Sequence, residues 1–509
     1  MKNLFFRRQY ILTNKTFGSP EGWNKLVIPS SQGELKLHYH PDLKVDSAND
    51  PQKMLVLIGY IIDPYNPDLV DADVLNHLML CNNFDELVRR TYTLSGRYAI
   101  LYTDGNVTRM FHDATAFREI YYCFSKNDIF CGATPDIINR YADTGLNKDP
   151  DMNEFLISDT YKQLGFWPGW ATPYNNIFHL MPNHYLDLDR KGFYRYWPEA
   201  KREKFGLKVA GMAMAEILKG TMTAASKRYK LHQALTCGFD TRVLLAASKD
   251  FKERVKYFVV QSGKLDDKHT DITVPKLIAG DAKLNFEVFV VGEKIEVDKE
   301  FEKIYLHNNI FARKHYLPVF YNDYLKKFDD TYKVAGTFGN EILRLAYPLK
   351  KTSVSAFEIA KIFRYEKYPF ALREIDNWLN KSRDIFIRND YNIVNMYFWE
   401  QFTANWSNLG ASEGAITREE IRPFNTRKLI TSYIGLADRH RYKDDPDGHL
   451  IMIKILWKDL LKYPLGVYYD MPLYRIKVFL RGLGLERIAN AVYTSVKNVV
   501  NSGWLKKMK

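Results

Sequence analysis

Residues 230–247 read KLHQALTCGFDTRVLLAA, and this stretch decides the fold of the chain. Its pattern predicts a strand over residues 230–236 and a helix opening at residues 241–247. The tight turn between them would present free backbone N–H groups and the positive end of the helix dipole, and its threonine hydroxyls would add donors. The turn therefore predicts a phosphate-binding loop, while an ordinary strand–turn–helix with Asp240 as N-cap is the plainer alternative.

Strands and helices alternate on both sides of this stretch. A helix is expected over residues 207–225, strands over 255–260 and 286–291, and a helix over 271–279. Such alternation predicts an α/β fold with a doubly wound parallel sheet and helices on both faces. Beyond residue 355 the pattern is mostly helical.

The first 200 residues are dominated instead by short strands and turns. The strands expected there cover residues 53–62, 97–102, 108–112, 119–124, 128–132, 185–188 and 193–197. A chain of 509 residues exceeds what one core usually spans, so two domains are expected. The texture changes near residue 198, which places the boundary at about residue 203 and the domains at 1–203 and 204–509.

Composition excludes several classes of protein. Lysine and arginine exceed aspartate and glutamate by 73 − 60 = 13, but no cluster has the density of a nucleic-acid-binding arm, so no nucleic-acid partner is expected. No apolar run is long enough for a membrane helix or a signal peptide. The four cysteines form no C-x-x-C pair, which fits a reducing, cytoplasmic location.

A second glycine-bearing turn with an acid lies at residues 334–343, VAGTFGNEIL. Two acids on separate turns at the carboxyl ends of strands suit a Mg²⁺ ion between them and phosphate oxygens. We therefore predict that Asp240 and Glu341 bind Mg²⁺. The alternative for Glu341 is a carboxylate in the first turn of a helix.

The order of these segments resembles the asparagine synthetase superfamily. The 236–241 loop is similar to the Ser-Gly-Gly-x-Asp-Ser of that family, and residues 336–341 to its Ser-Gly-Glu-Gly-x-Asp-Glu turn. Arg422-Pro423-Phe424 resembles its Arg-x-Pro-Phe-Leu-Asp. In the N-terminal half, residues 96–98 and 113–122 are similar to its Gly-x-Phe…Arg-Asp-x-x-Gly-x-x-Pro-Leu-Tyr-Tyr.

The resemblance implies an N-terminal-nucleophile (Ntn) αββα sandwich followed by an ATP-pyrophosphatase domain with ATP and Mg²⁺ as cofactors. The implied catalytic residues are Asp240, Glu341 and Lys443, with Lys454 and Lys458 as alternatives for a pyrophosphate-facing lysine. The implied nucleotide contacts are Leu235, Thr236, Cys237, Gly238, Phe239, Asp240, Thr241, Val259, Val260 and Gly336.

The chain departs from the family at three places. The glutamine-using members carry a cysteine directly after the initiator methionine, whereas Lys2 stands here, so no glutaminase activity is expected. Cys237 replaces a loop glycine. In the second turn, one register puts Asn340 on the family's aspartate, and the other, which we prefer, keeps the charge at Glu341 and puts Phe338 near the acyl acceptor.

These features predict an AMP-forming amide ligase that adenylates a small-molecule or glycan carboxylate and transfers the acyl group to ammonia or an amine. Asparagine synthesis from aspartate and ammonia, a catalytically degenerate ATP-binding scaffold, and a pyrophosphatase acting on RNA are the alternatives. The oligomeric state is left open, a homodimer included.

Overall fold

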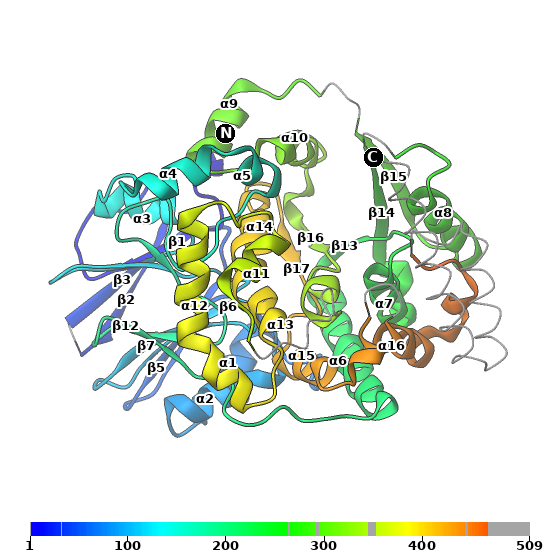
Figure 1. The fold of residues 1–509 in the computed structure, drawn as a ribbon, viewed down its shortest axis with the longest axis horizontal. Coiled ribbons are helices and arrows are strands. Elements are labelled where there is room, and N and C mark those ends of the chain that lie inside the picture. The colour runs from blue at the N-terminus through cyan, green and yellow to red at the C-terminus, as the bar shows by residue number, and fades with distance from the viewer. Residues whose placement is uncertain are drawn as a thin grey trace.

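Two six-stranded antiparallel sheets form the N-terminal half of the chain (Figure 1). The computed structural model describes residues 2–31, 33–262, 265–291, 295–344, 353–442 and 446–466. The first sheet has the order β10 (Phe178–His179), β8 (Tyr121–Phe124), β9 (Ile129–Gly132), β1 (Tyr10–Thr13), β3 (Gly33–Tyr39) and β2 (Asn24–Ser30). The second has the order β12 (Gly192–Arg195), β11 (His184–Asp187), β7 (Thr108–His112), β6 (Ser95–Thr103), β5 (Met54–Ile62) and β4 (Val45–Asn49).

Strand β5 shows why the two sheets stack. Its side chains alternate between faces, as the period of two in a strand requires. Val56 and Ile58 join Leu12 and Leu37 in the core between the sheets. Leu55 and Leu57 face the other way, toward helices α1 (Asp71–Met79) and α2 (Phe84–Arg90).

Helix α3 (Pro135–Ala142) covers the outer face of the first sheet through Ile137 and Ile138. The N-terminal half is thus an αββα sandwich, and the predicted layering is confirmed.

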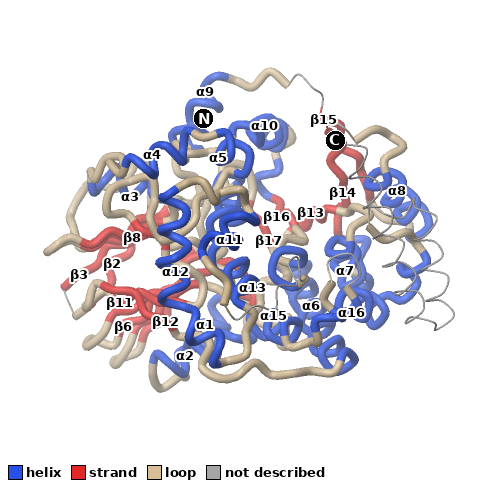
Figure 2. Tube along the Cα trace, viewed as in Figure 1, coloured by secondary structure: helices blue, strands red, loops and turns tan. Residues whose placement is uncertain are grey.

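A five-stranded parallel sheet lies at the heart of the C-terminal half (Figure 2). Its order is β15 (Phe286–Val291), β14 (Val255–Ser262), β13 (Lys230–Ala234), β16 (Thr331–Val334) and β17 (Glu419–Ile421). From β13 the chain first adds strands on one side and then on the other, so the order switches between β13 and β16. Clefts for ligands form at the carboxyl ends of strands at such a switch point. The predicted α/β class with a doubly wound parallel sheet is confirmed.

Helices surround this sheet and fill the rest of the chain. They are α4 (Pro150–Ile157), α5 (Asp159–Leu164), α6 (Leu207–Arg228), α7 (Phe239–Ala247), α8 (Thr270–Ala282), α9 (Lys299–Asn308), α10 (Leu317–Leu325), α11 (Ala356–Ile362), α12 (Pro369–Arg388), α13 (Ile393–Tyr397), a π-helix (Phe398–Asn408), α14 (Leu409–Gly414), α15 (Arg427–Ile434) and α16 (Asp447–Trp457). Within the described part, no helix is both long and apolar enough to cross a membrane.

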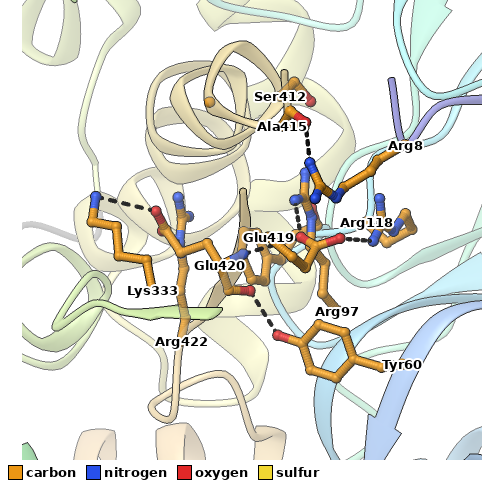
Figure 3. Close-up of polar contacts among 12 residues, drawn as sticks. Arg8, Tyr60, Arg97, Arg118, Lys333, Ser412, Ala415, Glu419, Glu420 and Arg422 are labelled. Atoms are coloured by element: carbon orange, nitrogen blue, oxygen red, sulfur yellow. Dashed lines mark hydrogen bonds and ion pairs between the residues drawn. The ribbon is translucent and has the colours of Figure 1, made fainter. Parts of the chain in front are cut away.

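The two halves share one continuous core rather than a thin contact. Tyr60 and Phe117 of the sandwich belong to the same buried cluster as Val334 and Phe338. At its edge the carboxylate of Glu419 is buried among arginines of the sandwich (Figure 3). The last sandwich strand ends at Arg195 and helix α6 starts at Leu207, and the boundary at residue 203 stays a prediction between them.

Candidate functional site

The 236–241 loop runs from the end of β13 into the first turn of α7, at the switch point of the parallel sheet. Three of its N–H groups are bonded within the protein. Thr236 N–H donates to Thr241 Oγ1 at 3.1 Å, and Gly238 N–H to Thr236 Oγ1 at 3.1 Å. Cys237 N–H donates to Asp271 Oδ1 at 3.0 Å. The loop is therefore held in shape by its own hydroxyls and by the first turn of α8.

The first turn of α7 has backbone N–H groups without an acceptor in the described part of the chain. Gly238 is the N-cap, in extended conformation and without a side-chain cap, so Asp240 lies inside the helix and the alternative in which Asp240 is the N-cap is wrong. No acceptor among the described residues reaches the N–H groups of Phe239, Asp240 and Thr241. Three such N–H groups at the positive end of a helix dipole favour an anion.

The second turn packs directly on the first. A Cβ added to Gly339 would lie 2.3 Å from Asp240 Oδ1, and one added to Gly336 would lie 2.9 Å from Asp240 Cβ. Glycine is needed at both positions because any side chain would displace the aspartate. The structure thus brings together Gly336, Asp240 and the turn that carries Glu341.

Gly339→Ala is expected to lower the free energy of unfolding by about 2–3 kcal/mol, because the new methyl group breaks the hydrogen bonds of Asp240. Chemical denaturation measures this. Gly280→Ala is the matched control: Gly280 lies in α8 with nothing within 4 Å of an added Cβ, so that change should stabilise by about 0.5–1 kcal/mol. Equal effects at the two glycines would contradict the close packing.

Both carboxylate oxygens of Asp240 already have partners. Oδ1 accepts from His449 Nε2 at 2.9 Å, and Oδ2 accepts from Arg344 Nη2 at 3.0 Å. Burial acts to raise the pKa of Asp240, but the Arg344 guanidinium and the His449 ring outweigh it and hold that pKa below its usual value. The carboxylate is therefore ionised and balanced by one arginine.

A chain of hydrogen bonds continues from Asp240 through His449 to Tyr433. Burial lowers the pKa of His449, which is 0% exposed, so the ring is neutral near pH 7. Because ionised Asp240 can only accept, Nε2 of His449 carries the proton and Nδ1 accepts from the Tyr433 hydroxyl at 2.6 Å. Burial raises the pKa of Tyr433, which keeps that hydroxyl protonated.

The carboxylate of Glu341 is bonded within its own turn and is not directed toward a metal site beside Asp240. Its Oε2 accepts from the N–H of Phe338 at 2.9 Å, as a first-turn carboxylate does. Burial and the nearby charge of Asp240 raise the pKa of Glu341. The described residues contain no group of three His, Cys, Asp or Glu side chains that would hold a metal ion. As arranged here, Asp240 and Glu341 do not fit the predicted Mg²⁺ site, because a cation at Asp240 would have to displace Arg344 and His449.

The other predicted contacts are spread over two places. Val260 and Glu341 line one cavity of about 340 Å³ on a face of the sheet, together with Thr337. Leu235 and Val259 are buried in the protein interior instead. Phe338, expected near an acyl acceptor, is buried against Phe117 of the sandwich at 6.3 Å between ring centroids.

The basic groups that the structure describes beside Asp240 are residues that sequence patterns missed, and the role of Lys443 stays a prediction. Lys443 lies outside the described residues, and Lys454 and Lys458 are exposed. The basic groups at Asp240 are His449 of α16 and Arg344, which follows the second turn. Nothing local in the sequence distinguishes His449 from the other 11 of the 12 histidines, since its role depends on where α16 packs.

Cys237 is a buried thiol rather than a nucleophile. It is 1% exposed, and burial followed by the charge of Asp271 raises its pKa to about 12. The other three cysteines are also buried. We expect iodoacetamide to modify native Cys237 at pH 8 at least ~100-fold more slowly than the unfolded chain in guanidinium, because the thiolate is the reactive form. Peptide mass spectrometry measures both rates, and similar rates would contradict the burial.

Comparisons with known proteins add little to this geometry. No protein-family model matches the chain, and no curated protein matches its sequence. It is similar to a solved glutamine phosphoribosylpyrophosphate (PRPP) amidotransferase from B. subtilis, complexed with ADP and GMP, at 7% identity over 60% of this chain and 88% of that chain, with a TM-score of 0.24. It is also similar to a structure described as the allosteric regulatory enzyme of purine biosynthesis, at 8% identity over 57% of this chain and 75% of that chain, with a TM-score of 0.24. At such TM-scores neither likeness bears on the function of this chain.

Proposed function

We propose that the chain binds ATP through its phosphates at the carboxyl edge of the parallel sheet and uses it to form an amide bond. The observation that carries the proposal is the first turn of α7, whose N–H groups at residues 239–241 have no acceptor among the described residues. This turn lies at the switch point of a doubly wound sheet, where such folds bind ligands. The hydroxyls of Thr236 and Thr241 lie beside it, 3.0 Å apart.

The charges around the loop are compatible with an anion. Asp240 is balanced by Arg344 at 3.0 Å, and His449 is neutral. A guanidinium at this edge suits phosphate oxygens, which arginine binds through its planar donors. The phosphates would therefore meet backbone donors, hydroxyls and a balanced carboxylate.

The reaction is inferred from the order of motifs shared with the asparagine synthetase superfamily. The carboxylate of a small molecule or glycan attacks the α-phosphorus of ATP, and pyrophosphate leaves. An amine or ammonia then attacks the acyl carbon, and AMP leaves. The chain's own contribution is to bind and orient the phosphates. Ammonia would come from solution, because all four cysteines of the chain are buried.

A nucleotide-binding protein without turnover is the second candidate. It is favoured by the closed state of the loop: both oxygens of Asp240 are paired, and the N–H of Cys237 is bonded to Asp271. Loop groups that are already satisfied inside the protein are not available to stabilise a transition state.

Two measurements on the full chain test the proposal. Calorimetric titration with ATP should show binding, and a dissociation constant above ~1 mM would contradict both candidates. Exchange of labelled pyrophosphate into ATP, dependent on aspartate or uronic acids, would support the ligase over the binding protein. Thr241→Val should weaken ATP binding about tenfold by removing the hydroxyl that accepts Thr236 N–H. Thr273→Val, at an exposed position of α8, is the matched control and should change nothing.

Chelation is expected to leave ATP binding almost unchanged. Arg344 and His449 already bond both carboxylate oxygens of Asp240. We therefore expect the dissociation constant of ATP in EDTA to lie within about twofold of that in Mg²⁺. Calorimetry in the two buffers measures this. A tenfold weakening in EDTA would show that the aspartate turns from its partners toward a metal ion.

A further inference from the structure

A second large cavity lies away from the 236–241 loop. It measures about 830 Å³, is open to solvent on one side, and is lined by the end of α12, the start of α13 and the segment that follows α15. This volume is within the range of pockets that bind organic ligands. None of residues 235–241 lines it, so it is separate from the proposed nucleotide site.

The lining of this cavity is unequally charged. Four basic side chains line it, Arg202, Lys204, Arg439 and Arg441, against two acidic ones. One of the acids, Asp390, is already paired with Arg202 at 3.1 Å and Lys204 at 3.4 Å. No carboxylate of the described residues lies within ion-pair distance of Arg439 or Arg441. The lining of the cavity therefore carries more positive than negative side chains.

Arg441 is the most unusual of these groups. It is only 3% exposed, and its Nη2 atom has no hydrogen-bond partner among the described residues. Its Nε donates to the carbonyl oxygen of Leu343 at 3.1 Å. Burial lowers its pKa to about 10, although Tyr433 and Asp438 act to raise it, so the charge is retained at neutral pH with no carboxylate of the described residues in direct contact. An unpaired buried charge is costly, and a bound anion would offset that cost.

Asn395 provides a second unsatisfied group in the same cavity. It is 6% exposed, and its Oδ1 has no partner among the described residues. Buried polar atoms without partners are rare in folded proteins. The unsatisfied donor of Arg441 indicates a ligand that supplies an acceptor, and Asn395 adds a polar group to the wall of the same cavity.

The remaining walls are apolar and aromatic. Phe205, Tyr391, Met396 and Leu436 line the cavity beside the charged groups. We propose that this cavity binds an organic anion, a carboxylate or phosphate ester on an apolar or aromatic body, with Arg441 as its charged anchor. Planar guanidinium groups bind both kinds of oxyanion through paired hydrogen bonds.

One hydrogen bond connects this cavity to the region of the 236–241 loop. Arg441 bonds Leu343, the last residue of the helical turn Gly339–Leu343 that contains Glu341, and Arg344 follows directly. The cavity is thus connected to the turn that packs on Asp240. The proposal itself does not depend on nucleotide binding.

Matched probes test the charge requirement. Calorimetric titrations of the full chain with 1-naphthoate, 1-naphthyl phosphate and the neutral 1-naphthamide separate the anionic head from the aromatic body. We expect at least one of the anions to bind tenfold or more tightly than the amide, and this difference to shrink in high salt. Equal affinity of all three probes, or no binding of either anion, would overturn the proposal.

Arg441→Gln removes the charge while keeping a donor for Leu343, and should weaken binding of the preferred anion at least tenfold. Arg388→Gln, at an exposed position of α12 that does not line the cavity, is the matched control and should bind as the wild type does. Asn395→Asp leaves Arg441 in place and adds a negative charge to the cavity. This variant should also bind the anion more weakly than the wild type does. It therefore keeps the proposal testable if Arg441→Gln fails to fold. Unchanged anion affinity in either folded variant would overturn the role of the cavity.

Discussion

Glu419→Ala is expected to lower the free energy of unfolding by about 3–5 kcal/mol, because it leaves buried arginines without their carboxylate. Glu419 Oε1 accepts from Arg97 Nη1 at 2.5 Å and its Oε2 from Arg118 Nη2 at 3.0 Å (Figure 3). All three side chains are buried where the sandwich meets the parallel sheet. Removing the carboxylate therefore strands two positive charges in the contact between the halves. Urea denaturation measures the loss.

An exposed ion pair provides the control for this effect. Glu203 lies 3.9 Å from Lys428, and its own side chain is 71% exposed, so Glu203→Ala should change stability by less than about 1 kcal/mol. If Glu419→Ala lowers the free energy of unfolding no more than Glu203→Ala does, the buried ion pairs of Glu419 do not stabilise the contact between the halves.

The same carboxylate predicts an acid limit of stability. Burial acts to raise the pKa of Glu419, but Arg97 and Arg118 outweigh it and lower that pKa to about 2. A carboxyl whose pKa is lowered by folding contributes stability above its unfolded pKa, and this is lost as the pH falls through the folded value. Wild-type stability should therefore fall between about pH 5 and pH 2. The fall should be shallower in Glu419→Gln.

Asp240→Ala is expected to lower the free energy of unfolding by about 2–4 kcal/mol, because it removes the acceptor of two buried donors. His449 Nε2 and the Arg344 guanidinium both lose their hydrogen bond to this carboxylate. Thermal and urea denaturation, read against the wild type, measure the loss.

Asp240→Asn separates the role of Asp240 as a hydrogen-bond acceptor from the effect of its negative charge on ATP binding. The amide oxygen still accepts from one donor, so the loss of stability should be about half that of alanine. Removing the negative charge should also tighten ATP binding in EDTA, since phosphate no longer faces a carboxylate. Weaker ATP binding of this variant in Mg²⁺ buffer, but not in EDTA, would show that Asp240 attracts the nucleotide through a metal ion.

Local sequence patterns were sufficient for strands β5 to β9 and β11 to β15 and for helices α6 to α8. The apolar run in residues 53–62 reflects a strand that is buried on both faces, and the helical spacing in residues 207–225 reflects a helix with one buried face; they appear as β5 and α6. The loop at residues 236–241 was recognisable because turn chemistry and helix capping act over a few residues. Strands β1 to β4 were not predicted: β2 and β4 are interrupted by exposed and polar residues, and β1 is only four residues long.

Partners across the chain were beyond the reach of such patterns. Asp240 bonds His449, 209 residues later, and Arg344, 104 residues later. Glu419 bonds Arg97, 322 residues earlier. The sequence alone established an α/β chain with an acid-bearing loop after its central strand. Only tertiary packing decided that this acid faces an arginine and a histidine, because the partner of a buried charge is set by which distant helices meet around it.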